Sequence, residues 1–294
     1  MKLTCVTATF NCIKAGNRER LIRCVESVAK LRTEHEHLIY DGASKDGTSE
    51  LLRELESKTP SLKVVSEPDT GIYNALNKGV RDAKGEWFYV LGADDYICHP
   101  DVMDDLIASE DLDTAVIVAE VERDSGNLFF RKMEDFARIF QGVPCSHQGL
   151  IMRTDNVVRH FGGFDETRYR VCSDWEMMLK AHDAGLKHHY VFKAFANYAV
   201  GGASECGDGV SGLEVKRIIE RQLGLSNHES EKYWKTGVAP WRCILRFYKH
   251  VDFAYRLAAR QMLNVRIKNI LRVVLYPLVL LRRFWRKLRG SYAY

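Results

Sequence analysis

Two adjacent carboxylates, Asp94 and Asp95, form the pair of residues in this sequence best suited to chemistry. They follow an apolar run, Trp87–Leu91, that is typical of a buried strand, and a short turn of small residues, Gly92-Ala93. Neighbouring carboxylates repel each other, and a divalent cation that prefers oxygen ligands, Mg²⁺ or Mn²⁺, relieves that repulsion. The pair therefore predicts a metal site, with a solvated acidic turn as the alternative.

Further polar side chains lie where other apolar runs end. Thr7 lies near the end of the first run, Leu3–Ala8, and Thr9 and Asn11 come after it. Asp41 directly follows the second run, His37–Tyr40. Parallel strands bring their carboxyl ends to one edge of a sheet, so these side chains and the two acids are expected to converge on one crevice. Carboxylates that accept hydrogen bonds from a base or sugar, beside metal-bound carboxylates that hold a diphosphate, indicate a nucleoside diphosphate ligand.

The sequence contains neither G-x-x-x-x-G-K-[ST] nor a G-x-G-x-x-G after the first apolar run. The metal and basic side chains would therefore have to balance the phosphate charge. Lys78 is a candidate, because it shares with Asn74 the polar side of a predicted helix; a solvated surface lysine is the alternative. The apolar side of that helix carries Ile72, Ala75, Leu76, Gly79, Val80 and Ala83.

Apolar runs and helical periodicity alternate through the first hundred residues. Strands are predicted at Leu3–Ala8, His37–Tyr40, Leu62–Val65 and Trp87–Leu91, with helices at Arg18–Leu31, from Thr48 to about Glu56, and over residues 72–83. This alternation predicts an α/β fold with a mostly parallel sheet and flanking helices. Beyond Asp95 the pattern loosens, and we predict strands at Thr114–Val121, Asn127–Arg131, Lys187–Phe192 and Ala194–Val200, a strand that ends at Arg153, and a helix that opens at Ser173.

Composition narrows the class of protein. The eight cysteines are scattered through 294 residues without a C-x-x-C pair, which favours reduced thiols in a cytoplasmic protein. The segment Leu3–Ala8 is too short for the apolar core of a secretory signal. Ten of the 43 Lys and Arg residues follow Asp252, where no acidic residue occurs, so the body is mildly acidic and no affinity for nucleic acid is expected.

The C-terminal residues 206–294 are predicted to form a helical, basic and amphipathic extension. Its apolar run Val273–Leu281 is nine residues long, much shorter than the roughly 20 residues of a spanning helix. Basic residues between 282 and 289 alternate with Phe284 and Trp285, a mixture that suits an interfacial helix on anionic lipid. The alternative is a helix that packs on the domain or on an oligomer partner.

The order of the motifs resembles that of glycosyltransferase family 2, whose members are inverting enzymes of the GT-A fold. The resemblance covers Leu3 to Ser204 and rests on these segments: Val6–Asn11, Asp41–Thr48, Ser66–Gly79, Gly92–Asp95, Ser146–Gln148, Ser173–Glu176 and Gly201–Ser204. Gly92 stands where the family's Asp-x-Asp motif often has its first acid. The Gln-x-x-Arg-Trp motif of processive synthases and their membrane-spanning helices are not found, which favours transfer of a single sugar.

The resemblance implies a role for each matching residue of the donor site. Asp41 would accept a hydrogen bond from the base, Asp94 would lie near the ribose or the metal, and Asp95 would ligate the metal that holds the diphosphate. The remaining donor-binding residues would be Thr7, Thr9 and Asn11 in the nucleotide pocket, and Asn74 and Lys78 beside the nucleotide or donor sugar.

The resemblance also implies residues on the acceptor side. Asp174 would be the general base that takes a proton from the acceptor hydroxyl, and the N-terminus of its helix would help to keep it ionised. His147 and Trp175 would face the acceptor or the diphosphate. A helix cap for Asp174 and an ordinary loop histidine for His147 are the alternatives.

These inferences predict a GT-A domain over residues 1–205, with a donor half (1–95) and an acceptor half (96–205), and the extension over residues 206–294. The expected enzyme is a hexosyl- or N-acetylhexosaminyltransferase that uses Mn²⁺ or Mg²⁺ and a nucleotide-diphosphate sugar, foremost a UDP-sugar. A lipid-linked saccharide is the expected acceptor, in bacterial surface polysaccharide or lipopolysaccharide O-antigen assembly at the inner face of the cytoplasmic membrane.

Two other functions remain open. A sugar-1-phosphate nucleotidyltransferase would share the sheet, nucleotide and metal, but it needs a basic glycine-rich loop that Thr7–Asn11 does not supply. A non-catalytic sugar-nucleotide-binding assembly partner is disfavoured by the four aspartates Asp41, Asp94, Asp95 and Asp174.

Overall fold

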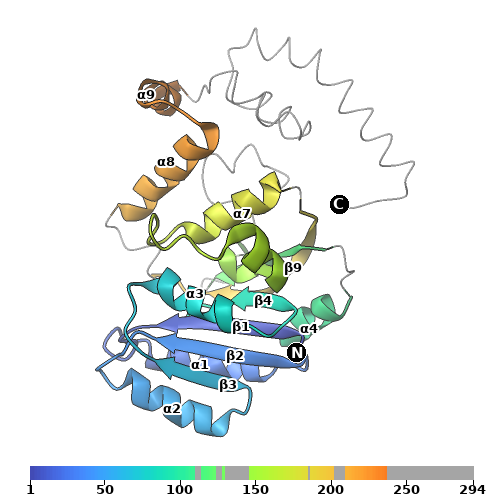
Figure 1. Ribbon diagram of the computed structural model, residues 1–294. Coiled ribbons are helices and arrows are strands. Elements are labelled where there is room, and N and C mark those ends of the chain that lie inside the picture. Colours follow the sequence, from blue (N-terminus) through green and yellow to red (C-terminus); the bar gives the residue numbers. More distant parts are fainter. Residues whose placement is uncertain (110–113, 124–127, 130–145, 185, 202–208, 237–294) are drawn as a thin grey trace, which may run out of the picture. The chain divides into compact units, whose positions relative to one another are not determined.

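The computed structural model describes residues 1–109, 114–123, 128–129, 146–184, 186–201 and 209–236 (Figure 1). The chain forms two compact units, one of residues 1–130 and 145–211 and the other of residues 131–144 and 212–294. The first unit holds every candidate site residue named above, so its sheet is described first.

The first unit is built on a nine-stranded sheet with the order β3-β2-β1-β4-β8-β6-β9-β5, with β7 paired to β6. The strands β1, β2, β3 and β4 pair in parallel, whereas β8 pairs antiparallel to both β4 and β6. The strand bounds are β1 Leu3–Thr9, β2 His35–Asp41, β3 Leu62–Ser66, β4 Trp87–Val90, β5 Tyr96–Ile97, β6 Val116–Arg123, β7 Leu128–Phe129, β8 Leu150–Arg153 and β9 His188–Tyr198. The sheet is therefore parallel in its N-terminal half and mixed beyond β4.

Helices cover both faces of this sheet (Figure 1). On one face, Cys24 and Val28 of α1 (Arg18–Ala29) and Met103 of α4 (Pro100–Ser109) share a buried cluster with strand residues such as Trp87 and Phe195. On the opposite face α3 (Ile72–Asp82) packs on β1 and β2. The helix α2 (Thr48–Lys58) packs beside β3. Burial of these apolar faces supplies the main stabilising free energy of the unit.

A glycine sets the distance between α3 and the sheet. A Cβ atom at Gly79 would lie 2.4 Å from Cγ1 of Val6 on β1, far inside van der Waals contact. The helix therefore approaches β1 closely, and this approach brings the N-terminal turn of α3 to the carboxyl edge of the parallel strands.

Short elements make up residues 147–161 of the first unit. A 3-10 turn, η2 (His147–Gly149), precedes β8, and α6 (Thr154–Asn156) continues into a π-helical turn, η3 (Val157–Phe161). The helix α7 (Ser173–Asp183) packs against η3. These pieces place residues 147 and 174 near the end of the parallel half of the sheet.

The described part of the second unit consists mainly of α8 (Val210–Leu223) and α9 (Asn227–Thr236). Ile218, Ile219 and Leu223 are buried, and Trp234 donates from its indole nitrogen to Glu220 at 3.2 Å.

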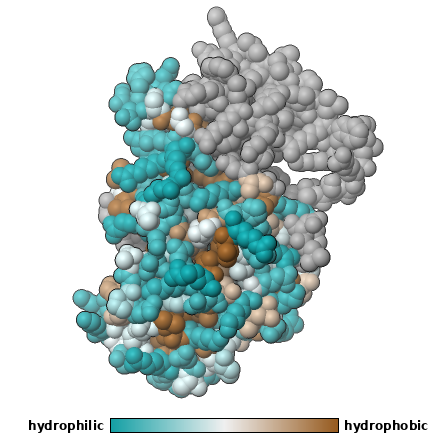
Figure 2. Space-filling view, in the orientation of Figure 1, coloured by the Kyte–Doolittle hydropathy of each residue, from teal (hydrophilic) through white to brown (hydrophobic). Residues whose placement is uncertain are grey.

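The surface view shows a mainly hydrophilic face of the described residues, with apolar residues confined to small patches (Figure 2).

The predicted fold class is confirmed, and each of the first four strands and three helices lies where the sequence predicts it. Two details differ. The predicted strands at 187–192 and 194–200 are one strand, β9, and Ile72, predicted on the buried side of α3, is 46% exposed. The predicted basic helix near the C-terminus lies outside the described residues. Among the residues described, no helix is long and apolar enough to cross a membrane.

Candidate active site

The two carboxylates after β4 differ in their surroundings. Asp95 is 2% exposed, and its oxygens accept hydrogen bonds from Nε2 of Gln148 at 2.7 Å and from the backbone nitrogen of Ala199 at 2.8 Å. Burial, together with the charge of Asp94, raises the pKa of Asp95 to about 6. Asp94 is only partly buried. Of the two, Asp94 is therefore the carboxylate that a ligand can reach.

The glycine at the family's first acid position has a structural reason. A Cβ at Gly92 would lie 2.4 Å from Oδ2 of Asp95 and 3.1 Å from Oδ1 of Asp94. The small residue leaves room for the inward-pointing carboxylate of Asp95. An acid at position 92 could therefore not be added without moving Asp95.

Gln148 was not among the predicted site residues, although it holds Asp95 in place. Its side chain is 1% exposed, and Ser146 donates a hydrogen bond to its amide oxygen. The backbone carbonyl oxygen of Gln148 accepts a hydrogen bond from the hydroxyl of Tyr89 at 2.9 Å. Because Gln148 adjoins His147, which contacts Asp174, the turn η2 connects the aspartate pair to Asp174.

Asp174 lies in the first turn of α7, as predicted, and its carboxylate has contacts from three sides. Oδ1 accepts hydrogen bonds from the Tyr73 hydroxyl at 3.2 Å and from the backbone nitrogen of Trp175 at 2.9 Å, while Oδ2 lies 3.5 Å from Nδ1 of His147. The side chain is 21% exposed. Asp174 is thus held in one orientation and still open to solvent.

His147 lies between the base candidate and the aspartate pair. Burial alone would lower its pKa, but the hydrogen bond and charge of Asp174, with the charges of Asp95 and Asp94, raise the pKa above its ordinary value. A protonated imidazole at this position would place a positive charge beside three carboxylates. The structure therefore brings Asp94, Asp95, His147 and Asp174 into one electrostatically coupled group.

Tyr73 is a further residue that the sequence did not single out for a role with Asp174. Its hydroxyl donates to Asp174 and accepts a hydrogen bond from the backbone nitrogen of Ser173 at 2.9 Å. Its ring stacks on Phe164 at a centroid distance of 5.4 Å, and the side chain of Asn77 bonds both the nitrogen and the oxygen of Phe164. The helix α3 thereby positions the start of α7.

Asp41 ends β2 as predicted, but its carboxylate is 1% exposed and already has several donors. Burial would raise its pKa, whereas hydrogen bonds from Ser44, Ser66 and Ser49 outweigh that effect and hold the pKa below its ordinary value. Thr9 also donates to it at 3.1 Å. As placed here, Asp41 organises the loop around it and does not present a free oxygen to a base.

The other residues predicted for the nucleotide pocket divide into buried and accessible ones. Thr7 is fully buried and bonds Nε2 of His37 at 2.9 Å. Asn11 is partly exposed at a positive φ of 47°, and its side chain accepts a hydrogen bond from the nitrogen of Lys45. Ala43, on the facing loop, also has a positive φ, of 55°. Backbone strain of this kind is often found at ligand sites.

An accessible carboxylate near Asp41 is Asp69, which was not among the predicted site residues. Its Oδ1 accepts a hydrogen bond from the nitrogen of Gly71 at 2.9 Å, and a Cβ at Gly42 would lie 2.8 Å from its Oδ2. Phe10, 65% exposed, lies against the same glycine. Gly42 leaves space for the side chains of Asp69 and Phe10. A glycine directly after Asp41 was therefore the feature of the sequence that could have indicated neighbouring site residues.

Lys78 and Asn74 lie on α3 as predicted. The ammonium group of Lys78 pairs with Glu67 at 2.8 Å and donates to the oxygen of Pro68 at 3.2 Å, with 14% of the side chain exposed. It is therefore not a solvated surface lysine. Trp175, by contrast, is 0% exposed, and in this position it supports α7 from within the core and cannot contact the acceptor or diphosphate.

The donor atoms at this edge fit a hard divalent cation. Asp94 offers an accessible carboxylate, Asp95 lies directly behind it, and carboxylate oxygen is the ligand that Mg²⁺ and Mn²⁺ prefer. The arrangement offers one accessible carboxylate for a metal ion at Asp94 and a second accessible carboxylate at Asp174.

Comparison with known proteins identifies a matching family. The family described as Glycosyl transferase family 2 matches residues 4–172. A PGL/p-HBAD biosynthesis glycosyltransferase of Mycobacterium bovis is 26% identical over 208 residues, which cover 69% of this chain and 78% of the relative. The chondroitin synthase of Escherichia coli is 27% identical over 190 residues, which cover 61% of this chain and 26% of that enzyme.

Solved structures share the fold. S. aureus TarS in complex with UDP-GlcNAc superposes with a TM-score of 0.63 at 19% identity, covering 89% of this chain and 74% of that one. The mannosyltransferase PcManGT from Pyrobaculum calidifontis, in complex with GDP-Man and Mn²⁺, has a TM-score of 0.56 at 19% identity, covering 98% of this chain and 84% of the other.

Proposed function

This chain belongs to glycosyl transferase family 2, and from that premise we propose that it transfers one sugar from a nucleotide-diphosphate sugar to an acceptor hydroxyl with inversion. The observation that carries the proposal is the placement of Asp174. Its carboxylate is oriented by Tyr73 and His147, remains open to solvent, and is coupled through His147 to the aspartate pair.

A UDP-sugar is the proposed donor. TarS, which shares the fold, is known in complex with UDP-GlcNAc, and PcManGT with GDP-Man. On this chain the edge formed by Phe10, Asn11 and Asp69 offers an exposed ring and partly exposed polar groups for a base. Asp41 would act from behind by fixing this loop, with its oxygens bonded to serine hydroxyls.

Asp94 is proposed as the principal metal ligand, with Asp95 in support. Mn²⁺ or Mg²⁺, when bound, would offset the negative charge that develops on the departing nucleoside diphosphate. Gln148 and the backbone nitrogen of Ala199 hold Asp95 by hydrogen bonds, and they thereby fix the turn that also carries Asp94. Lys78 would stay on its Glu67 partner as a fixed positive charge beside the donor.

Asp174 is proposed as the general base. It would accept the proton of the acceptor hydroxyl while that oxygen attacks the anomeric carbon and the diphosphate oxygen leaves from the opposite face. The Tyr73 hydroxyl and the Trp175 backbone nitrogen both bond Oδ1, which leaves Oδ2 as the oxygen nearer to His147 and to an incoming group. A single displacement inverts the anomeric configuration.

A lipid-linked saccharide is proposed as the acceptor, in the assembly of a bacterial surface polysaccharide. Two relatives are named for PGL/p-HBAD biosynthesis and for chondroitin synthesis. The basic, aromatic residues near the C-terminus suit contact with anionic lipid, as the sequence predicts. A hexose or an N-acetylhexosamine is the proposed sugar.

Turnover tests the proposal. Purified protein with Mn²⁺, UDP-sugars and a bacterial lipid extract as acceptor is expected to release UDP, and Asp174→Asn should lower that rate by roughly 10²-fold or more. The control is Asp155→Asn, because Asp155 is 75% exposed and pairs only with Arg159 among the described residues. Near-normal turnover in Asp174→Asn would place the base elsewhere, and equal losses in both variants would remove the special role of Asp174.

A further inference from the structure

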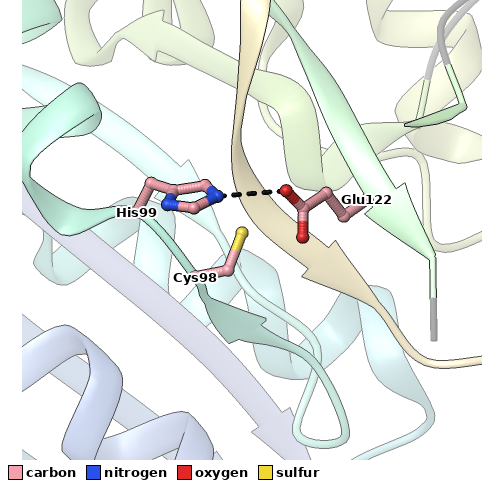
Figure 3. A group of neighbouring side chains, drawn as sticks. All are labelled: Cys98, His99 and Glu122. Atoms are coloured by element: carbon pink, nitrogen blue, oxygen red, sulfur yellow. Dashed lines mark hydrogen bonds and ion pairs between the residues drawn. The ribbon is translucent and has the colours of Figure 1, made fainter. Parts of the chain in front are cut away.

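Three side chains with metal-binding atoms meet on the first unit, outside the donor and acceptor sites. Cys98 and His99 follow β5, and Glu122 lies near the end of β6. The ligand atoms of all three lie within 4.8 Å of one another, and Nε2 of His99 is 3.0 Å from the carboxylate of Glu122. Figure 3 shows the thiol, the imidazole and the carboxylate directed toward a common space.

The backbone fixes this arrangement before any ligand binds. The nitrogens of Cys98 and His99 both donate to the carbonyl oxygen of Phe195 on β9, at 2.9 and 3.1 Å. The strand β9 lies between β5 and β6 and pairs with both. The segment that carries the thiol and the imidazole is therefore anchored to the strand next to the one that carries the carboxylate.

From this geometry we propose that Cys98, His99 and Glu122 bind one Zn²⁺ ion, with water as the fourth ligand. Sulfur, imidazole nitrogen and a single carboxylate form a ligand set that suits zinc, whereas Mg²⁺ and Mn²⁺ prefer oxygen throughout. Zinc bonds of about 2 Å at tetrahedral angles put nitrogen and oxygen ligands about 3.3 Å apart, close to the separation of His99 and Glu122. The side chain of His99 is 49% exposed, so water can reach the fourth position.

A redox-reactive cysteine accounts less well for the cluster. Burial and the neighbouring Glu122 carboxylate raise the pKa of the Cys98 thiol to about 12, opposite to the lowered pKa of reactive cysteines. Nor is the cluster an extension of the donor site. The strand β5 separates Cys98 from Asp95, whose carboxylate is bonded to Gln148 and Ala199.

A bound zinc would join β5 and the start of α4 to β6. Asp94 and Asp95 immediately precede β5. The ion would therefore link the segment that follows the aspartate pair to β6, with ligands unlike those of the pair itself.

Cobalt spectroscopy on the full chain, stripped of metal with a chelator, tests the site. Co²⁺ bound at the cluster is expected to give a thiolate-to-cobalt charge-transfer band, which Zn²⁺ then abolishes by displacement; Co²⁺ held by the carboxylates Asp94 and Asp95 gives no such band. Cys98→Ser should lose the band. His99→Asn should weaken Zn²⁺ by about 10²-fold or more, because even loss of an outer-shell partner costs roughly 10–100-fold.

Matched variants separate the site from other thiols and imidazoles. Cys172→Ser and His160→Asn, which change residues outside the cluster, should bind as the unmodified chain does. Glu122→Gln, at a partly exposed position, should fold and still weaken Zn²⁺ at least tenfold, so the test stands even where Cys98→Ser fails to fold. Absence of a thiolate band in the unmodified chain, or its survival in Cys98→Ser, would overturn the proposal, as would unchanged zinc affinity in Glu122→Gln.

Discussion

At the scale of single residues, the site depends on side chains that orient other side chains. Gln148 holds Asp95, three serines hold Asp41, and Tyr73 with His147 orients Asp174. For the buried Asp95 and Asp41, these contacts satisfy carboxylates that water reaches poorly. These carboxylates are thus fixed in orientation before any ligand binds, which is the preorganisation that the role proposed for Asp174 needs.

Tyr73→Phe removes one hydroxyl from this network and keeps the ring. The variant should leave the donor KM nearly unchanged and lower kcat by roughly tenfold or more, because a hydrogen bond to a charged group is worth about 1.5–3 kcal/mol. Steady-state kinetics with varied donor measure both constants.

Tyr40→Phe is the matched control for Tyr73→Phe. Tyr40 is also buried and donates its hydroxyl to Asp82 at 2.6 Å, but it makes no contact with Asp174. Its kcat should equal that of the unmodified protein. A similar loss of kcat in both variants would show that Tyr73 acts through general stability and not through Asp174.

The sequence identified the ionisable residues of this site better than their orientation. Asp94 and Asp95 were predicted from their position after a strand, whereas His147 and Asp174 were predicted from the resemblance to the family. The inward turn of Asp95, the complete burial of Trp175 and the saturation of Asp41 depend on packing between segments far apart in the chain. Such packing leaves no local signal in the sequence.

At the scale of helices and strands, the contact between α3 and β1 positions the donor side. Gly79 permits it, since any side chain there would meet Val6. The same helix carries Tyr73 and Asn77, which contact α7 and the Phe164 turn. The distance between α3 and the sheet therefore also affects the position of Asp174.

Gly79→Ala should destabilise the first unit by about 1–3 kcal/mol through overpacking. Adding Val6→Ala opens the space that the new methyl group needs, so the double variant should recover part of the loss. Urea unfolding measures both. If the double variant lost as much free energy of unfolding as the two single variants lost in sum, that result would contradict the direct contact between residue 79 and Val6.

Regular alternation explains which of these segments the sequence predicted. Strands β1 to β4 and helices α1 to α3 follow clear periodic patterns and were located to within a few residues. The two-residue strand β5 and the helix α4 were not predicted: β5 is too short to show a period, and α4 has four aspartate or serine residues in ten. The mixed half of the sheet likewise rests on pairing between distant segments.

At the scale of the whole molecule, acid sensitivity should follow from a buried histidine. Burial, with the charge of His35, lowers the pKa of His37 to about 3, and its side chain is 1% exposed. Between pH 3 and about 6.5 the unfolded chain binds a proton at this residue that the folded chain does not. The stabilising contribution of the neutral His37 should therefore be at its full value above pH 6.5, and the free energy of unfolding should fall as the pH drops toward 3.

The contribution of His37 amounts to about 2 kcal/mol between pH 6.5 and pH 5. His37→Gln removes the titrating group and keeps a side chain able to bond Thr7. Chemical unfolding at a series of pH values should show a flatter dependence for this variant over that range. An identical slope in both proteins would assign the acid sensitivity to other groups.

The central claim is that the first unit, which contains the family match, holds a metal-dependent binding site for a nucleotide sugar. The measurement that tests it most directly is thermal unfolding of the full chain with UDP-, GDP-, dTDP- and CMP-sugars, with and without Mn²⁺. A ligand that binds only the folded state raises the apparent stability. The account predicts a rise with a UDP-sugar that requires Mn²⁺ and disappears in Asp94→Ala, with Asp155→Ala as the control; no rise with any donor, or the same rise without Mn²⁺ and in Asp94→Ala, would contradict it.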